Sequence, residues 1–389
     1  MKLFIEPLDV MFFRDGKPFV AGQSHLAQSV FPPTSLTFQG AIRSTILTVT
    51  GIGVERFRLA QQGADDPEAT QMMEEIGGST SFGRLRLRGP FVASVSEEIP
   101  IPTIAEEWYP CPADVLRRRG DDASDPTRLL PVDQPPWMSD LLDALWPLWA
   151  FSGARVEAAN GLVSGAEMTR YLTGDVPQVM RLNHFVTREE RLGIALSMGK
   201  KVAREGQLYT LEVCRFNATG GRRFGFLLGV EGTTRLPDRG MLALGGERRA
   251  ATYEQIATSP WPEGHGVSQA IDATRRFILY LATPAIFTNE PLWLPDFVDS
   301  NALTGTRHDV TIKVRAVAAG RPIPIGGWDL AANHPRAMHP AVPAGSVYWC
   351  EVLSGTGRDV MQAFHGQCLS SMFAEIGLGQ TFVGRWAHV

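Results

Sequence analysis

The sequence predicts an α+β protein built from two small mixed sheets, each carrying helices on one face. Three observations predict this class. An apolar strand, a polar loop and a helical pattern follow one another within residues 1–50. Apolar runs typical of strands return at residues 275–282, 310–316 and 346–353. A helical pattern follows them at residues 359–375, so both halves of the chain use the same kinds of element.

The opening unit runs from a strand at residues 3–5 to a helix at residues 36–50. The pair Pro32 and Pro33 cannot continue a helix, whereas Thr34 or Ser35 can cap one. We expect the apolar face of this helix to pack on a sheet as the start of a βαβ arrangement. Four side chains form that face: Leu36, Ile42, Ile46 and Val49.

A second helix and a second strand follow. Asp66 is placed to cap the helix, Pro67 suits its first position, and Gly77 ends it. Strict alternation at residues 82–88 predicts a strand with its leucines toward the core and its arginines in one row on the other face. This row of Arg84, Arg86 and Arg88 either lines an RNA path or meets nearby acids, and the pattern favours neither.

Residues 100–147 contain many prolines and predict a long surface excursion. The apolar stretch at residues 141–149 is either a docking face for another protein or, more ordinarily, a loop packed on its own core. The later strands and helix complete a fold of two ferredoxin-like (RRM-like) domains with loop insertions. We expect the first at residues 1–265 and the second, with a glycine-rich loop, at residues 266–389.

Composition narrows the class of protein. The chain is 44% hydrophobic and 20% charged, which is typical of a globular protein. No apolar run reaches the roughly 20 residues that a membrane span requires. The four cysteines show no paired spacing, so no zinc knuckle or disulfide framework is indicated. We expect a cytoplasmic protein without membrane contact, metal or cofactor.

Catalytic motifs are missing from the sequence. Gly377 and Gly379 lack the third glycine of a dinucleotide loop, and no Lys-Ser or Lys-Thr closes a P-loop. The eight histidines make no metal-ligand spacing, and no Gly-x-Ser-x-Gly elbow occurs. His25 is the one loop residue that could act as a general acid or base in RNA cleavage, although a lone loop histidine is more often simply exposed. We therefore expect no catalytic centre.

Three stretches are candidate anion or RNA contacts, although the net charge of −4 argues mildly against a nucleic-acid partner. The helix start at Ser35, with Gln39 and Arg43, suits a phosphate. Residues 244–249 place two glycines before two arginines, which permits close approach of a phosphate or else forms a turn with a surface Glu247 to Arg249 pair. Residues 181–223 hold nine basic residues against four acids, a partner surface or a solvated strand face.

Several segments in order resemble one family, the repeat-associated mysterious proteins (RAMPs) of CRISPR systems, and within it the third subunit of the type III-B Cmr effector complex. The resemblance implies two ferredoxin-like domains, no catalytic centre and a part in a ribonucleoprotein of antiviral defence. It also implies contact with the 5′ handle of the guide RNA (crRNA), with the large polymerase-cyclase subunit and with a backbone RAMP subunit. Eight segments carry it: residues 7–19, 31–44, 191–196 with 205–209, 244–249, 282–287, 326–329, 343–348 and 377–386.

The resemblance and the residue chemistry together predict the RNA contacts. In RAMP subunits a hairpin often folds over the guide as a thumb, and residues 183–191 occupy that place, with Phe185 as a wedge between bases and Arg181 and Arg188 as clamps. The competing interpretation buries Phe185 and pairs Arg188 with an acid. The full predicted set is Arg14, Ser35, Gln39, Arg43, Phe185, Arg188, Gly245, Gly246, Arg248, Arg249, Gly379 and Arg385.

Two alternatives to a guide-binding subunit remain. One is a metal-independent endoribonuclease that processes CRISPR repeat RNA with His25 as general acid or base. The other is a protein adaptor that keeps the fold and makes no RNA contact.

Overall fold

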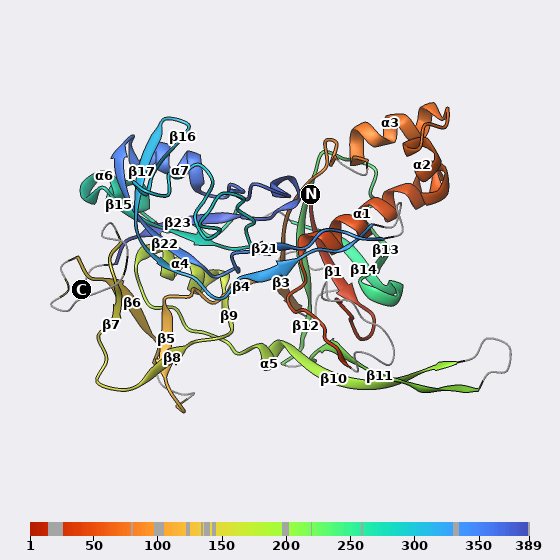
Figure 1. The fold of residues 1–389 in the computed structure, drawn as a ribbon, viewed down its shortest axis with the longest axis horizontal. Coiled ribbons are helices and arrows are strands. Elements are labelled where there is room, and N and C mark those ends of the chain that lie inside the picture. The colour runs from red at the N-terminus through yellow and green to blue at the C-terminus, as the bar shows by residue number, and fades with distance from the viewer. Residues whose placement is uncertain are drawn as a thin grey trace. The chain divides into compact units, whose positions relative to one another are not determined.

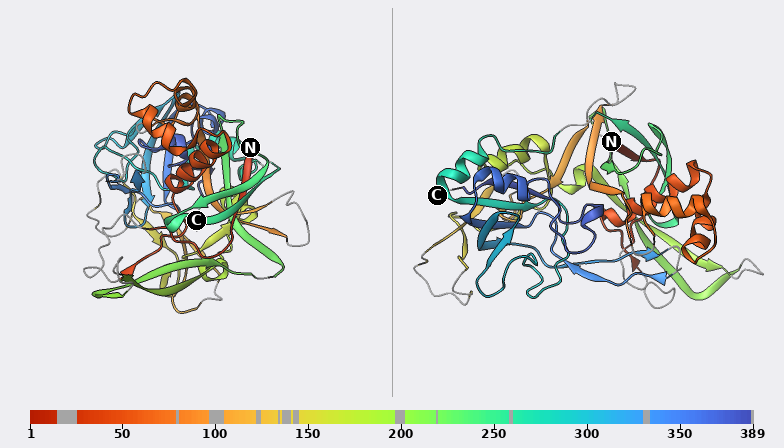
Figure 2. Two further views of the ribbon diagram at one scale, coloured as in Figure 1. Left: turned by 90° about the vertical axis from the view of Figure 1, so that its right-hand side faces the viewer. Right: turned by 90° about the horizontal axis from the view of Figure 1, so that it is seen from above.

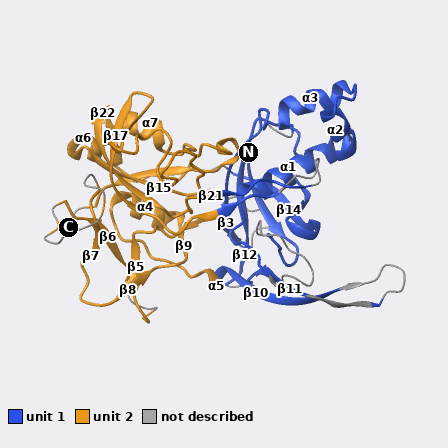
Figure 3. Cartoon of the chain, in the orientation of Figure 1, with its two compact units in different colours: residues 1–105, 183–258, 324–339 blue, residues 106–182, 259–323, 340–389 orange. Residues whose placement is uncertain are grey.

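The chain forms two compact units, each assembled from separate stretches (Figure 3). The computed structural model describes residues 1–14, 26–78, 81–96, 105–121, 125–133, 135, 141, 145–196, 202–218, 220–257, 260–329 and 334–387. Unit 1 comprises residues 1–105, 183–258 and 324–339, and unit 2 comprises residues 106–182, 259–323 and 340–389. The division therefore differs from the single boundary expected at residue 265, although the change of unit after Thr258 falls close to it.

The sheet of unit 1 has the strand order β13-β14-β1-β12-β3, and its neighbours are antiparallel. Strands β1 and β3 both run antiparallel to β12 and hence parallel to each other, with three helices in the connection between them (Figure 1). The expected βαβ opening is therefore present, with β12 between its two strands. The bounds are β1 Lys2–Pro7, β3 Arg86–Ser96, β12 Arg222–Glu231, β13 Arg239–Leu244 and β14 Arg249–Ile256.

The helices of unit 1 begin and end close to the predicted residues. Helix α1 (Ser35–Val49) buries Phe38, Ile42 and Ile46 completely, whereas Val49 in its last turn is 48% exposed. Helix α2 spans Gly53–Gln61. Helix α3 (Pro67–Ile76) has Asp66 as its cap, because the Asp66 carboxylate accepts from the Ala69 amide at 3.1 Å, and it stops before Gly77 at φ +80°.

A long hairpin extends from unit 1, as Figures 1 and 2 show. Its strands are β10 (Val186–Leu196) and β11 (Ala203–Phe216), preceded by the short helix α5 (Leu182–Phe185). Strand β2 (Leu26–Ala27) pairs with β11 in parallel. The Tyr209 ring lies over Gly193 of β10, since a Cβ there would be 2.3 Å from that ring on the facing strand, so a larger residue would displace the ring.

Unit 2 has a five-stranded sheet in the order β16-β17-β22-β15-β23. Its neighbours are antiparallel, and β17 alternates buried and half-buried residues as predicted. Helices α6 (Val267–Thr274) and α7 (Gly357–Phe364) cover one face, where Ile271 and Phe364 pack with residues of the central strands. The strands are β15 Arg276–Leu281, β16 Thr304–Arg307, β17 Val310–Ala318, β22 Val347–Ser354 and β23 Thr381–Arg385.

The helix predicted at residues 359–375 is too long. Helix α7 ends at Phe364, and Gly366 takes a φ of +71°, which a helix cannot contain. Cys368 then forms an isolated bridge with Gln380, the residue before β23. The spacing of four residues between Phe364 and Cys368 therefore does not come from a helix. A short 3₁₀ turn, η2, follows at Ala374–Ile376.

The described parts of the proline-rich stretch, residues 105–121 and 125–133, contain strands, contrary to the prediction of a surface excursion. Strands β5, β6, β7 and β8 form a sheet in the order β7-β6-β5-β8, and β4 pairs with β9 ahead of helix α4. Pro110 and Pro131 are the last residues of β4 and β6, where a missing amide hydrogen is tolerated. The bounds are β4 Glu106–Pro110, β5 Val115–Arg118, β6 Thr127–Pro131, β7 Leu148–Ala150, β8 Val156–Ala158, β9 Leu162–Ser164 and α4 Gly165–Thr173.

The apolar stretch at residues 141–149 packs in part on unit 2. The indole of Trp146 contacts the guanidinium groups of Arg276 and Arg315, each 5.2 Å from the ring centroid, and lies edge-on to Trp386 at 5.8 Å. Trp386 is only 7% exposed, so it is a packing residue, whereas Trp149 is 48% exposed. Of the two interpretations, the structure therefore supports packing for Trp146.

Short strands complete the described chain. Strand β18 (Ile323–Ile325) pairs with β21 (His339–Ala341), and β19 (Trp328–Asp329) pairs with β20 (His334–Pro335). Among the residues described, no helix is both long and apolar enough to cross a membrane.

A buried ion pair joins three elements of unit 2. The Arg128 and Asp114 side chains are 4% and 0% exposed, and their charged groups lie 2.8 Å apart. Tyr171 of α4 donates to the second Asp114 oxygen at 2.9 Å, and the Arg128 guanidinium lies 4.3 Å from the Tyr171 ring centroid. Burial and the Asp114 charge raise the pKa of Tyr171, which keeps its hydroxyl protonated as a donor.

Replacing Arg128 with Met should destabilise the protein strongly, because Asp114 would then be a buried carboxylate without a cation. We expect a loss of about 3–5 kcal/mol in the free energy of unfolding, measured by urea denaturation. The control is Glu157→Gln, which removes a partly exposed pair with Arg117 at 3.3 Å and should cost less than about 1 kcal/mol. Similar losses in the two variants would contradict a structural role for the buried pair.

Candidate nucleic-acid interface

The turn between β13 and β14 is pressed against the segment that follows β1. The Gly246 amide donates to the Phe12 carbonyl oxygen at 2.7 Å. A Cβ on Gly245 would lie 2.6 Å from that oxygen, and one on Gly246 would lie 2.7 Å from the Phe12 ring. Glycine is therefore needed at both positions, and Gly245 also has a φ of +73°.

The two arginines of this turn differ in their partners. Arg249 pairs with Glu247 at 2.5 Å and lies 4.0 Å from Asp9, so its charge is largely neutralised. Arg248 is exposed and makes no hydrogen bond or ion pair with the described part of the chain. The sequence offered the Glu247 to Arg249 pair as an alternative to anion binding, and the structure contains that pair while leaving Arg248 available for a ligand.

The segment that leads into α1 is hydrogen-bonded to the residues that follow β1. The Val30 amide donates to the Phe13 carbonyl at 2.8 Å, and the Phe13 amide donates to the Ser29 hydroxyl at 3.0 Å. The next residue, Arg14, bridges to Ser29 and is exposed. The backbone of residues 12–14 thus links the glycine turn to an exposed arginine and to the start of α1.

The start of α1 contains two buried polar side chains without partners. Ser35 and Gln39 are 3% and 4% exposed, and neither Ser35 Oγ nor Gln39 Nε2 has a hydrogen-bond partner within the described structure. Helical side chains lean toward the N-terminus, so Gln39 leans back over the turn that holds Ser35. Arg43 is engaged elsewhere, since its guanidinium donates to the Gly77 carbonyl at 2.7 Å and lies 5.6 Å from the Phe57 ring centroid.

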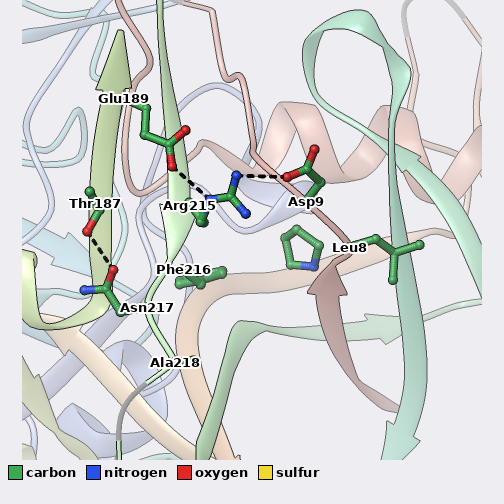
Figure 4. Close-up of a pocket in the computed structure, with 9 residues that line it drawn as sticks. Leu8, Asp9, Thr187, Glu189, Arg215, Phe216, Asn217 and Ala218 are labelled. Atoms are coloured by element: carbon green, nitrogen blue, oxygen red, sulfur yellow. Dashed lines mark hydrogen bonds and ion pairs between the residues drawn. The ribbon is translucent and has the colours of Figure 1, made fainter. Parts of the chain in front are cut away.

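A pocket of about 590 Å³ lies between the loop after β1 and the base of the hairpin (Figure 4). Arg215 donates from Nε to Glu189 at 2.9 Å and pairs with Asp9 at 3.2 Å. Asn217 donates to the Asn183 and His184 carbonyls and accepts from Thr187. The pocket is lined by Pro7, Leu8, Asp9, Thr187, Glu189, Arg215, Phe216, Asn217 and Ala218.

The charges around this pocket form one alternating series. Arg191 pairs with Glu189 at 3.1 Å, and Glu189 also pairs with Arg215. Asp9 pairs with both Arg215 and Arg249, so the series of charges continues to the glycine turn. Hydrogen bonds from Arg215 and Arg191 hold the pKa of Glu189 below its ordinary value. Sequence reasoning missed the pocket, and the signal that pointed toward it was the mixture of acids and bases in residues 181–223.

The prediction that Phe185 is a wedge between bases is wrong. Phe185 is 0% exposed, with its ring edge-on to Phe224 at 5.5 Å and to His184 at 5.2 Å. Arg188 pairs with Glu212 at 2.5 Å and donates to the Ser29 carbonyl at 3.1 Å. The competing interpretation of this segment therefore holds, because apolar packing of the ring outweighs its exposure as a thumb tip.

Two predicted RNA contacts belong to unit 2 and have packing partners there. Gly379 is buried at φ +72°, and a Cβ would lie 2.4 Å from the Ser370 amide nitrogen. Arg385 donates to the carbonyls of His265 and Gly266 at 3.1 and 3.3 Å. Both residues therefore have structural roles within unit 2.

The structure also bears on the predicted row of arginines, on His25 and on metal binding. The predicted strand at residues 82–88 is correct only from Arg86 onward, because β3 begins there and Arg84 lies in a turn. Arg86 and Arg88 donate to main-chain carbonyls at Gly83, Leu85 and Leu87. His25 lies outside the described residues. Within those residues, no group of side chains is arranged to hold a metal ion.

The architecture is that of a mixed α+β protein with mostly antiparallel sheets, and a solved structure shares it. A chain of "Cryo-EM structure of the Type III-B Cmr-beta bound to cognate target RNA" matches with a TM-score of 0.51 and 14% identity, over 98% of this chain and 96% of that chain. A chain of the structure with cognate target RNA and AMPPnP, state 1, matches with a TM-score of 0.48 and 15% identity, over 90% and 86%. No curated protein matches the chain.

A family model identifies the chain among CRISPR-associated proteins. The model, described as "CRISPR-associated protein (Cas_Cmr3)", matches residues 3–386. The chain therefore belongs to the Cas_Cmr3 family, which confirms the resemblance that the eight sequence segments carry.

Replacing Phe185 with Ala should lower the free energy of unfolding by about 3–5 kcal/mol, because it removes a fully buried ring and leaves a cavity. Thermal or urea denaturation measures this loss, and Phe185→Leu should retain most of the stability. A Phe185→Ala protein of unchanged stability but weakened RNA binding would restore the wedge interpretation.

Proposed function

We propose that this protein is a non-catalytic subunit of a type III-B CRISPR effector complex that binds the 5′ handle of the guide RNA. The observation that carries the proposal is Arg248, an exposed arginine without a partner in the described chain, on a turn whose glycines permit close backbone approach. Family membership supports this assignment. The similar fold in a Cmr-beta structure bound to cognate target RNA is consistent with it.

In this proposal the protein works in the cytoplasm within a ribonucleoprotein. It contacts the large polymerase-cyclase subunit and a backbone RAMP subunit, as the family resemblance implies. The RNA-facing end of unit 1 comprises Arg14, the start of α1 and the turn from Gly245 to Arg249. These groups share the backbone of residues 12–14 as their common support.

We also infer that both units are ferredoxin-like. In unit 1 the four strands β1, β3, β12 and β14, numbered in chain order as first to fourth, have the spatial order fourth-first-third-second. In unit 2 the strands β15, β17, β22 and β23 have the same order. Each unit adds an edge strand, β13 or β16, and unit 1 connects its third and fourth strands through β13 instead of a helix.

The non-catalytic assignment is supported by the state of the reactive side chains. Burial raises the pKa values of the Cys111 and Cys350 thiols well above their ordinary range, so neither forms a thiolate near neutral pH. Burial lowers the pKa of His365, and its Nδ1 accepts from the Val383 amide, which is a packing role.

Replacing Arg248 with Ala should weaken binding of handle RNA roughly tenfold, as expected for loss of one charge-assisted contact. The slope of log affinity against log salt should become shallower by about 0.7, the value for one phosphate on a single strand. The matched variant Arg249→Ala should lose less, because Arg249 is already paired with Glu247. Affinity equal to wild type across the salt series would remove the turn from the RNA site.

Incubating the purified protein with CRISPR repeat RNA in EDTA should yield no cleavage, since we propose no catalytic role. Gel analysis of end-labelled RNA gives the measurement, and His25→Ala is the control variant. Cleavage by wild type that disappears in His25→Ala would establish the metal-independent endoribonuclease in place of the proposed function.

A further inference from the structure

We propose that the pocket at the base of the hairpin binds a nucleobase that carries an exocyclic amino group, either adenine, guanine or cytosine, of a single-stranded RNA. The inference rests on the proposed function and adds to it a base-reading subsite. The pocket volume of about 590 Å³ falls within the range of about 300–1,000 Å³ typical of small-ligand sites. Single-stranded RNA is commonly read through bases that leave the stack and enter such pockets.

The charge of the lining selects the kind of group that enters. Asp9 and Glu189 contribute two negative charges and Arg215 one positive charge, so the lining is net negative. A phosphate is disfavoured there, whereas an amino group can donate to carboxylate oxygens that retain lone pairs beside their arginine contacts. Uracil has no exocyclic amine and would leave this acceptor surface unmatched.

Apolar side chains also line the pocket and can contact the faces of a base, beside the polar Thr187 and Asn217. Phe216 is half-buried and Leu8 is 58% exposed, and both are among the lining residues drawn in Figure 4. The Phe216 ring is held in place by Phe224 at 6.4 Å and Phe226 at 5.1 Å between ring centroids. Contact between a base and an aromatic ring is sequence-tolerant, so the carboxylates, not the ring, supply the discrimination.

The rim of the pocket supplies the opposite charge. The Arg191 side chain is 40% exposed on β10 and pairs with Glu189, and Asp9 connects the pocket to Arg249 in the glycine turn. A strand of RNA can therefore place its phosphates near these arginines while one base enters the negative interior. Arg215 and Arg191 keep Glu189 ionised, because their hydrogen bonds lower the pKa of that carboxyl.

The test uses the reconstituted complex and guide RNAs with one altered handle nucleotide each. Purine riboside replaces adenosine, inosine replaces guanosine, and 2-pyrimidinone riboside replaces cytidine, so that each change removes one amino group. At one handle position we expect affinity to fall at least about fivefold in wild type, the lower end for loss of a specific base contact. The double variant Asp9→Ala, Glu189→Ala, which removes the acceptor oxygens, should show no such difference at that position.

Two further variants show whether a loss of base discrimination comes from the pocket or from a folding defect. Ala218→Trp places a bulky ring on an exposed lining residue and should abolish the same discrimination while RNA binding persists. Glu157→Gln, which alters an ion pair in unit 2, should retain the discrimination in full.

The outcomes separate this inference from the proposed function. Ultraviolet crosslinking of the guide RNA to this chain, without any amine-dependent position, would overturn the pocket assignment and leave the guide-binding role intact. Discrimination that persists in both pocket variants would also overturn it. Loss of complex assembly in both pocket variants, while each variant folds as wild type by circular dichroism, would likewise overturn it and assign the pocket to a basic side chain of a protein partner. An absence of crosslinks to this chain would instead remove the guide-binding role and favour the adaptor.

Discussion

The packing of the Gly245 and Gly246 backbone on Phe12 is the contact on which the candidate interface depends. No side chain fits between the turn and the segment after β1, so the distance between them is fixed by main-chain contact. That contact brings Arg249 near Asp9, whereas Arg248 is exposed and has no ion pair within the described residues. A larger residue at either glycine would separate the turn from the support that it shares with Arg14 and the start of α1.

Electrostatic pairing then decides which arginines remain available for a ligand. The sequence shows an excess of basic residues between Arg181 and Arg223, but Arg188, Arg191, Arg215 and Arg223 each pair with a carboxylate. Exposed pairs of this kind contribute little to stability. Their effect here is positional, because the series through Asp9 and Glu189 defines the polar side of the pocket and connects it to the glycine turn.

The two units reach the same strand order by different connections. Unit 1 uses three helices between its first two sheet strands, whereas unit 2 uses a helix between its last two. In each case the apolar faces of helices and strands must be buried against one another, and the order is a compact way to do so. The long hairpin lies outside this requirement, since its register is fixed by its own strands and by a close contact at Gly193.

The sequence by itself determined what local chemistry controls. The proline pair predicted the start of α1, although Thr34 makes no capping hydrogen bond with its side chain there. Asp66 and Pro67 predicted the start of α3, Gly77 its end, and the alternation of β17 its two faces. The eight segments, in their order along the chain, indicated the family. Tertiary structure alone decided the pairing of β4 with β9, the burial of Phe185 against Phe224 and the packing of the glycine turn on Phe12. Each of these depends on a partner far away in the chain, so neighbouring residues carry no record of it.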